Sequence, residues 1–165
     1  MHDLAAHAGG EATFREYVRR RQEASTPQEE QRYLYALASF EDPALVQRTL
    51  ELSLDEIRPQ NAPFLVSRLL ANRVGGVAAW AFVEARWDDI VARFPEPLLD
   101  RMLDGVLVHN TPEAAARIRA FLDAHPVPGR ARQVAQLLER LDVHVAFRRR
   151  LTGGRATSAT TPWPA

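Results

Sequence analysis

The chain has 165 residues, and its 21 basic and 21 acidic side chains give a formal net charge of zero at pH 7, which argues against a nucleic-acid partner held by phosphate neutralisation. It has no cysteine, so disulfide frameworks and thiolate metal sites are excluded and a cytosolic address is permitted. No apolar run reaches the length of about 18 residues that a membrane span needs, and no signal peptide is visible. We expect one main cytoplasmic domain that binds neither nucleic acid nor a membrane.

Helix signals begin at the N-terminal end. Residues 1–10 resemble the last turn of a helix stopped by two glycines, which indicates the end of a preceding helix and a truncated domain start. Residues 11–24 have helical spacing. Thr26-Pro27 with Glu29 is a capping box that begins a helix predicted to reach Phe40.

Two more cap signals follow. Asp42-Pro43 begins a helix predicted to end near Leu52. The segment from Ser53 to Glu56 has a second capping-box pattern, which predicts only a short turn before Pro59.

The centre of the chain is predicted to be an antiparallel helix pair. Residues 60–71 form its first helix, and Gly75-Gly76 is the break between the two. The second helix places six large apolar residues on one face, namely Val77, Trp80, Val83, Trp87, Ile90 and Phe94. Burial of each such side chain contributes about 1.5–3 kcal/mol, so neighbouring helices must cover this face.

Three helices are predicted after Phe94. The first begins near Pro95, the second follows the cap Thr111-Pro112, and the last covers residues 131–151. Residues 152–165 are rich in Gly, Ser, Thr and Pro without periodicity, so we expect a disordered tail.

The predicted fold class is all-α, because no segment shows strand alternation. Helices joined by short loops in successive antiparallel pairs suit a HEAT- or armadillo-like α-solenoid over residues 11–151. A closed helical bundle is the competing architecture.

Catalytic signatures are lacking in the sequence. There is no HExxH, GxSxG or Walker pattern, and the five histidines are scattered. His109 and His125 lie at predicted helix ends, where a histidine usually bonds a terminal carbonyl. Asp88-Asp89 is best interpreted as a solvated face. From the residues alone, no metal or cofactor is expected in this chain.

Several motifs nevertheless go further. The segment Ile57-Arg58-Pro59-Gln60-Asn61 is followed by Asn72-Arg73-Val74-Gly75-Gly76, by Trp80-Ala81-Phe82 and Trp87-Asp88, and by Phe121-Leu122-Asp123-Ala124-His125-Pro126. In this order and spacing they resemble the C-terminal helical domain of the zinc aminopeptidases, the group of aminopeptidase N and of the puromycin-sensitive and endoplasmic-reticulum aminopeptidases. The likeness covers about residues 11–151.

The resemblance implies an α-solenoid bowl that closes over a catalytic domain and walls off a chamber. That catalytic domain would carry the zinc, and this chain would carry none. The implied partners are the catalytic domain of the same parent, in cis or in trans if the chain is truncated, and a peptide substrate.

Three arginines, Arg73, Arg93 and Arg101, are candidates to face the substrate, because arginines can attract a peptide carboxylate. Arg73 belongs to a matched motif, and Arg93 and Arg101 follow the matched tryptophan helix and start the next one. The alternative is that they tie helices together through carboxylates and carbonyls. The remaining motif residues are expected to be structural, and they are Arg58, Gln60, Asn61, Asn72, Gly75, Trp80 and Trp87. We expect Trp80 and Trp87 in the core. Asn72 and Gly75 are expected to end a helix and permit the turn after it.

The leading functional hypothesis is a non-catalytic C-terminal fragment of a zinc metallo-aminopeptidase that removes N-terminal residues from peptides. The alternative hypothesis is a freestanding α-solenoid that binds a protein or peptide on its concave face. An independent enzyme has no supporting constellation of residues.

Overall fold

A computed structural model describes residues 10–156, except for the side chains of residues 153–156, and this part of the chain is helical without strands. The elements are α2 (Glu11–Gln22), α3 (Pro27–Leu37), α4 (Pro43–Asp55), α5 (Ala62–Leu70), α6 (Gly76–Ala85), α7 (Trp87–Arg93), α8 (Glu96–Leu103), the 3-10 helix η1 (Asp104–Val108), α9 (Pro112–Ala124) and α10 (Ala131–Ala156). The all-α prediction is confirmed. The helix end predicted within residues 1–10 and most of the predicted tail lie outside the described residues.

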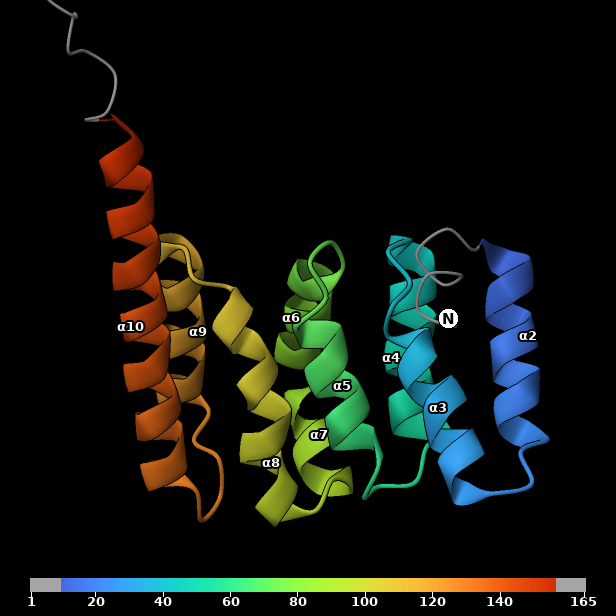
Figure 1. Ribbon diagram of the computed structural model, residues 1–165. Helices are drawn as coiled ribbons and strands as arrows, with labels where there is room; N and C mark the ends of the chain where they lie inside the picture. Colours follow the sequence, from blue (N-terminus) through green and yellow to red (C-terminus); the bar gives the residue numbers. More distant parts are fainter. Residues whose placement is uncertain (1–9, 157–165) are drawn as a thin grey trace, which may run out of the picture.

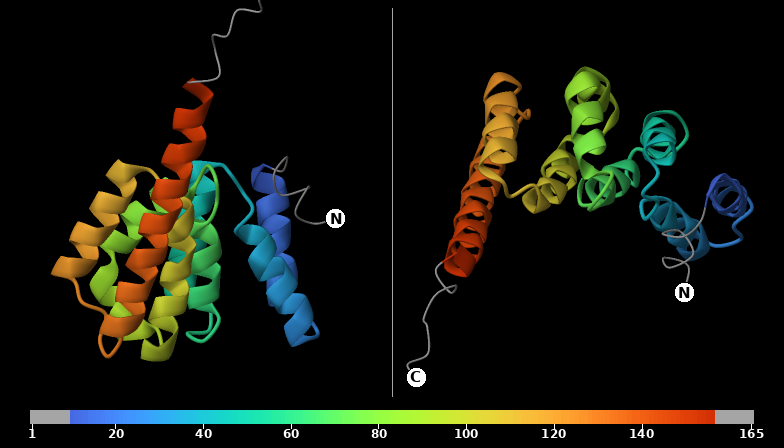
Figure 2. Two further views of the ribbon diagram at one scale, coloured as in Figure 1. Left: turned by 60° about the vertical axis from the view of Figure 1, so that its left-hand side comes forward. Right: turned by 90° about the horizontal axis from the view of Figure 1, so that it is seen from above.

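The helices stand side by side in one row (Figure 1). Seen from above, α3, α5, α8 and α10 form one layer, and α4, α6, α7 and α9 form a second layer (Figure 2). Contacts within the first layer join α3 to α5, α5 to α8 and α8 to α10. The row is bowed so that this first layer lies on the inner side of the curve (Figure 2). We call it the inner layer.

Two apolar clusters form the core. The larger one runs from α3 to α10 and includes the predicted helix faces of the central pair. The smaller one packs α2 against α3 and α4 through Phe14, Tyr17, Tyr33, Ala36, Leu37, Phe40 and Leu45. The edge-on contact of Phe14 with Phe40, with ring centroids 5.4 Å apart, lies in this second cluster. Helix α2 is therefore held mainly by aromatic packing.

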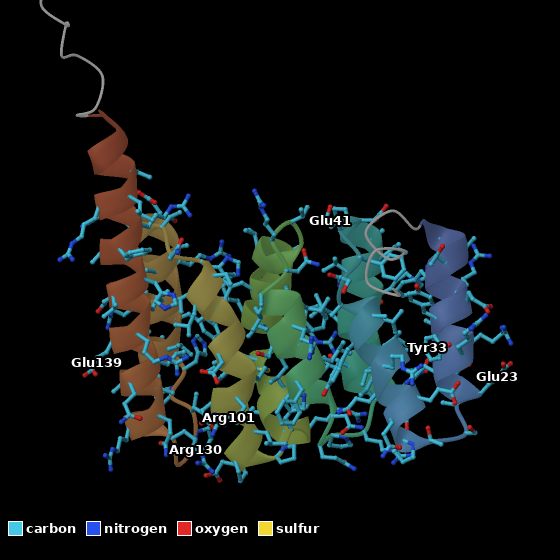
Figure 3. All side chains as sticks on the ribbon, in the orientation of Figure 1. Glu23, Tyr33, Glu41, Arg101, Arg130 and Glu139 are labelled. Carbon is cyan, nitrogen blue, oxygen red and sulfur yellow. The ribbon has the colours of Figure 1, made fainter. Side chains whose placement is uncertain are left out.

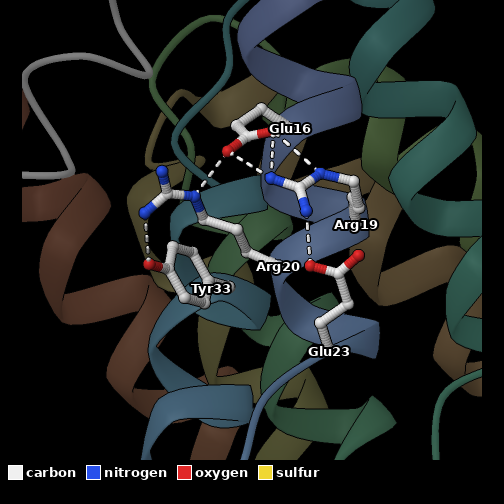
Figure 4. Close-up of polar contacts among 5 residues, drawn as sticks. All are labelled: Glu16, Arg19, Arg20, Glu23 and Tyr33. Atoms are coloured by element: carbon white, nitrogen blue, oxygen red, sulfur yellow. Dashed lines mark hydrogen bonds and ion pairs between the residues drawn. The ribbon is translucent and has the colours of Figure 1, made fainter.

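Polar contacts also join α2 to its neighbours. Figure 4 shows Glu16 accepting hydrogen bonds from Arg19 and Arg20, while Arg20 reaches across to the Tyr33 hydroxyl on α3 at 3.1 Å. The buried Arg21 donates to Glu56, just past α4, at 2.7 Å. The exposed pairs of Arg19 with Glu16 and Glu23 lie within α2 and its C-cap and attach it to no other helix. The contact of the buried Arg21 with Glu56 therefore contributes to the attachment, whereas the pairs of Arg19 do not.

The predicted helix starts are confirmed at three caps. The Thr26 hydroxyl accepts from the Glu29 amide at 3.2 Å, the Asp42 carboxylate accepts from the Ala44 amide at 2.8 Å, and the Thr111 hydroxyl accepts from the Ala114 amide at 3.2 Å. Each cap satisfies an amide that the first helical turn leaves unpaired.

Two capping details were wrong. Glu29 does not return to Thr26; its carboxylate accepts from the amide and the hydroxyl of Ser25, both at 3.2 Å. Ser53 is not a cap, because α4 continues to Asp55 and the buried Ser53 hydroxyl donates to the Leu50 carbonyl at 2.5 Å. A serine that bonds back to its own helix no longer ends it.

The second central helix is kinked rather than continuous. Arg86, with φ −120° and ψ 26°, separates α6 from α7. Its amide still donates to Phe82 at 2.9 Å and its carbonyl accepts from Ile90 at 3.0 Å. The apolar face is therefore kept from Trp80 onward, but Val77 in the first turn is 65% exposed, contrary to the prediction.

The C-terminal helices differ from the prediction in two places. Helix α8 gives way to η1, where Gly105 approaches α5 so closely that a Cβ would lie 2.1 Å from the Ser67 carbonyl oxygen. Only glycine permits this approach. Helix α10 continues to Ala156, five residues past its predicted end at Leu151.

Asn72 joins two connections of the fold. Its amide nitrogen donates to the carbonyls of Ala38 and Phe40 at 2.9 and 3.0 Å, and its amide oxygen accepts from the amides of Val74 and Gly75 at 3.0 and 2.9 Å. The side chain therefore donates both of its N–H groups and accepts two hydrogen bonds at its oxygen, which is its full hydrogen-bonding capacity. The α3–α4 connection is thereby fixed to the α5–α6 turn.

Replacing Asn72 by alanine should lower the free energy of unfolding by about 3 kcal/mol, because two carbonyls and two amides lose their partner in a partly buried place. Urea unfolding followed by circular dichroism measures this. Asn110→Ala is the control, since Asn110 accepts one exposed bond, from Arg148 at 2.9 Å; we expect a change within about 0.5 kcal/mol. Equal midpoints for the two variants would contradict the role of Asn72.

Candidate functional site

A pocket of about 280 Å³ lies where the end of α5 meets α3 and the α3–α4 connection, and we call it the polar pocket because charged side chains line it beside apolar groups. Its lining residues are Tyr35, Ala38, Ser39, Glu41, Arg68, Ala71, Asn72 and Arg73. Because α3 and α5 both belong to the inner layer, the pocket is formed between two inner helices. Figure 3 labels Glu41 at the upper edge of the row of helices, near α4.

Two arginines, Arg68 and Arg73, place positive charge in this pocket. The Arg68 guanidinium lies over the Tyr35 ring, with Cζ 4.1 Å from the ring centroid. Arg73 is exposed and directly follows Asn72, whose four hydrogen bonds fix the local backbone. Among the side chains that the structure describes, no carboxylate forms a salt bridge with either arginine. Both fork-shaped donor groups are therefore available to a carboxylate ligand.

The pocket also contains a carboxylate of its own. Glu41 lines it and is already engaged in an interaction within the protein. An anionic ligand would therefore be attracted chiefly to the Arg68 and Arg73 side of the cavity.

Arg93 lies elsewhere and makes structural contacts. Its Nη2 donates to the carbonyls of Asp55 and Ile57 at 3.3 and 3.1 Å, and its Nε is buried without a partner. These bonds tie the end of α7 to the connection between α4 and α5. They correspond to the second interpretation of the arginines, in which they hold helices together.

Arg101 is exposed on α8 in the inner layer, and its nearest carboxylate is Asp104 at 3.9 Å. Figure 3 labels it toward the lower edge of the row on α8, whereas Glu41 is labelled at the upper edge near α4. Of the three predicted arginines, only Arg73 lines the polar pocket, so the structure does not gather them into one site.

The tryptophans of the motif are core residues, as predicted. Trp80 and Trp87 each meet Phe121 edge-on with ring centroids 5.5 Å apart, and Phe121 stacks on His125 at 4.2 Å. The Trp80 Nε1–H donates to Glu84 at 2.8 Å. Motif pieces that lie far apart in the sequence thus meet in one aromatic group.

The remaining motif residues are at the surface or in turns. Arg58 lies 3.6 Å from Glu30, Gln60 is exposed, and Asn61 precedes α5 without a side-chain capping bond. Gly75 has an ordinary φ of −80°, so the turn does not need glycine for its conformation. A Cβ there would lie 2.7 Å from Val46 Cγ2; close packing is the reason for glycine.

A second pocket, mostly apolar and about 210 Å³, lies between α6 and α9. Its lining residues are Val77, Trp80, His109, Glu113, Ala114, Arg117 and Ile118. His109 Nε2 lies 2.9 Å from the carbonyl oxygen of Leu70, the last residue of α5. His125 Nδ1 lies 3.0 Å from the carbonyl of Phe121. Both histidines therefore bond carbonyls at helix ends, as predicted.

Burial lowers the pKa of His109, although its hydrogen bond with Leu70 acts in the opposite direction. A neutral ring that donates from Nε2 satisfies the Leu70 carbonyl. Among the described residues, no three His, Cys, Asp or Glu side chains are close enough together to hold a metal ion. No helix in this part of the chain has the length and apolar character that crossing a membrane would require.

The pairing of Arg68 with Tyr35 was not predicted. The two residues come from different helices, and no local pattern links a tyrosine of α3 to an arginine of α5. The signal that was present is the position of Arg68 on the polar side of a strongly apolar helix.

Comparison with known proteins gives a consistent result. The family model described as the ERAP1-like C-terminal domain matches residues 2–143. The chain is 29% identical over 140 residues to glutamyl aminopeptidase of Mus musculus, which covers 81% of this chain and 15% of that protein. It is 29% identical over 142 residues to aminopeptidase M1-B of Oryza sativa (84% and 16% covered). It is 29% identical over 141 residues to alanine/arginine aminopeptidase of Saccharomyces cerevisiae (83% and 16% covered). The chain thus spans about a sixth of the length of these relatives.

The lowered pKa of His109 predicts a pH dependence of stability. Below the ordinary histidine pKa of about 6.5, the unfolded state binds the proton more readily than the folded state, so stability is lost as the pH falls. His109→Gln can still donate a hydrogen bond to the Leu70 carbonyl. As the pH falls from about 7.5 to about 5.5, this variant should lose less stability than the unsubstituted chain. Urea unfolding at each pH measures this, and parallel curves for the two proteins would refute it.

Proposed function

Because this chain belongs to the family of ERAP1-like C-terminal domains, we propose that it is the C-terminal helical domain of a zinc aminopeptidase that removes N-terminal residues from peptides. The observation that carries the proposal is the family match over residues 2–143. The aminopeptidase names of the relatives support it. Since the chain spans only 15% of the glutamyl aminopeptidase of mouse, the hydrolytic chemistry would belong to another part of the parent.

In this proposal the zinc ion is held by the catalytic domain, where it supplies an activated water molecule. The role of this chain is to cover the reaction chamber and limit access of bulk water. Residues 11–151 would act as one domain, a segment of α-solenoid whose inner layer faces the catalytic domain. The bowed row of antiparallel helices supports this arrangement (Figure 2). The partner domain could act in cis or in trans.

The polar pocket is the proposed point of contact with a peptide. Arg73 and Arg68 would bind a peptide carboxylate, which suits two guanidinium groups that have no salt-bridge partner among the described side chains. Arg101, exposed in the same layer, is the second candidate for substrate contact. Arg93 is assigned to holding α7 against the α4–α5 connection.

The carboxylate contact can be tested on the chain itself. A short peptide with a free C-terminal carboxylate should bind more tightly than the same peptide with a C-terminal amide. Arg73→Ala should weaken binding of the free acid about tenfold and leave the amide unaffected. Isothermal titration calorimetry measures both. Arg15→Ala, which removes an exposed arginine of α2 paired with Glu11, is the matched control. Equal affinities for acid and amide would rule out the pocket as a carboxylate site.

The family-level proposal needs the parent enzyme. The full-length parent should hydrolyse aminoacyl anilides and lose this activity when zinc is removed by a chelator, whereas the chain alone should be inactive. Removal of residues 11–151 from the parent should alter the rate on peptides more than the rate on the small anilides, because only peptides need the chamber. A parent without metal-dependent aminopeptidase activity would refute the proposal and favour a freestanding binding protein.

A further inference from the structure

Helix α10 carries an exposed apolar row that the proposed function does not use. Val143, Phe147 and Leu151 are 66%, 61% and 58% exposed. They recur every four residues, so they lie along one side of the helix. The opposite side is buried through Leu137, Leu138, Leu141 and Val145. We call Val143, Phe147 and Leu151 the α10 stripe.

The stripe runs from the part of α10 beside η1, where His144 Nδ1 lies 3.1 Å from the Leu107 carbonyl oxygen, toward the C-terminal end of α10, which extends beyond the neighbouring helices (Figures 1 and 2). It also lies at the edge of the region shared with the family. The family match ends at residue 143, so Phe147 and Leu151 follow it.

The surroundings of Phe147 and Leu151 are basic, whereas the exposed Glu139 precedes Val143 by four residues on the same side of the helix. Asp142 is the last carboxylate residue in the sequence, and it already pairs with Arg119 at 2.7 Å. Arg150 follows Phe147 by three residues and Arg148 precedes Leu151 by three, so both border the stripe. The hydrogen bond of Arg148 goes to the neutral Asn110 at 2.9 Å. Both arginines thus keep an uncompensated charge among the described side chains.

We propose that the α10 stripe docks an acidic amphipathic helix of another protein. The apolar residues of that helix would pack on Val143, Phe147 and Leu151, and its flanking carboxylates would pair with Arg148 and Arg150. The α10 stripe is one residue wide, which is the width of the apolar contact between two helices packed side by side. The proposal stands independently of the aminopeptidase function.

Two other occupants fit less well. A second copy of the chain would bring the same arginines against Arg148 and Arg150, which is unfavourable. A lipid surface is normally bound by a broad apolar face of about 100° or more, and the stripe is narrower. Both remain outcomes of the test.

The test uses the whole chain and two synthetic helical peptides about three heptads long. Both peptides carry leucine on the apolar face; one has glutamate and the other lysine at the flanking positions. Fluorescence anisotropy should show binding of the glutamate peptide, with affinity that falls as salt is added. Phe147→Ser should weaken it at least tenfold. Arg148→Glu combined with Arg150→Glu should reverse the preference in favour of the lysine peptide.

Val77→Ser is the matched control, because Val77 is as exposed as the stripe residues but lies on α6; binding should be unchanged. Circular dichroism checks that every variant is folded. The proposal is overturned if neither peptide binds or if both bind equally. It is also overturned if light scattering shows a dimer that Phe147→Ser abolishes, or if vesicles of phosphatidylcholine and phosphatidylserine bind the chain through Phe147 while the peptides do not.

Discussion

The side-chain amide of Asn72 is the interaction on which the arrangement of the inner layer depends. Its bonds to Ala38 and Phe40 reach the α3–α4 connection, and its bonds to Val74 and Gly75 shape the turn after α5. Ala38 belongs to the larger core cluster and Phe40 to the smaller one. Asn72 therefore binds the backbone of one residue from each of the two clusters. The same turn presents Arg73 to the polar pocket. Structure and proposed peptide contact therefore share one set of hydrogen bonds.

Local chemistry was enough to predict where most helices begin. Thr26, Asp42 and Thr111 are each followed by proline, and each caps the helix predicted for it. Other features of the fold depend on contact with residues distant in the sequence. Gly105 is needed because η1 approaches Ser67, and Gly75 because the turn packs on Val46. A periodic pattern contains no information about such approaches.

The candidate site was less predictable than the fold. The motifs that carry the family resemblance meet largely in the core, where Trp80, Trp87 and Phe121 form one aromatic group. Residues that pack in a core identify a fold without identifying a ligand. The guanidinium of Arg68 over Tyr35 is a tertiary contact between two helices, and neither residue belongs to the motifs. Of the three predicted arginines, Arg73 lines a pocket whereas Arg93 bonds backbone carbonyls.

A net charge of zero describes the whole chain but not its parts. All 21 carboxylates lie at or before Asp142, where many are paired with arginines of neighbouring helices, as Glu84 is with Arg117 and Asp104 with Arg140. The segment after Asp142 carries only cations. Because the apolar row of α10 lies in this segment, its surface differs in charge from the rest of the row of helices. The net charge of zero therefore argues against binding of nucleic-acid phosphates by the chain as a whole. It is compatible with the proposed binding of an acidic partner by the locally basic end of α10.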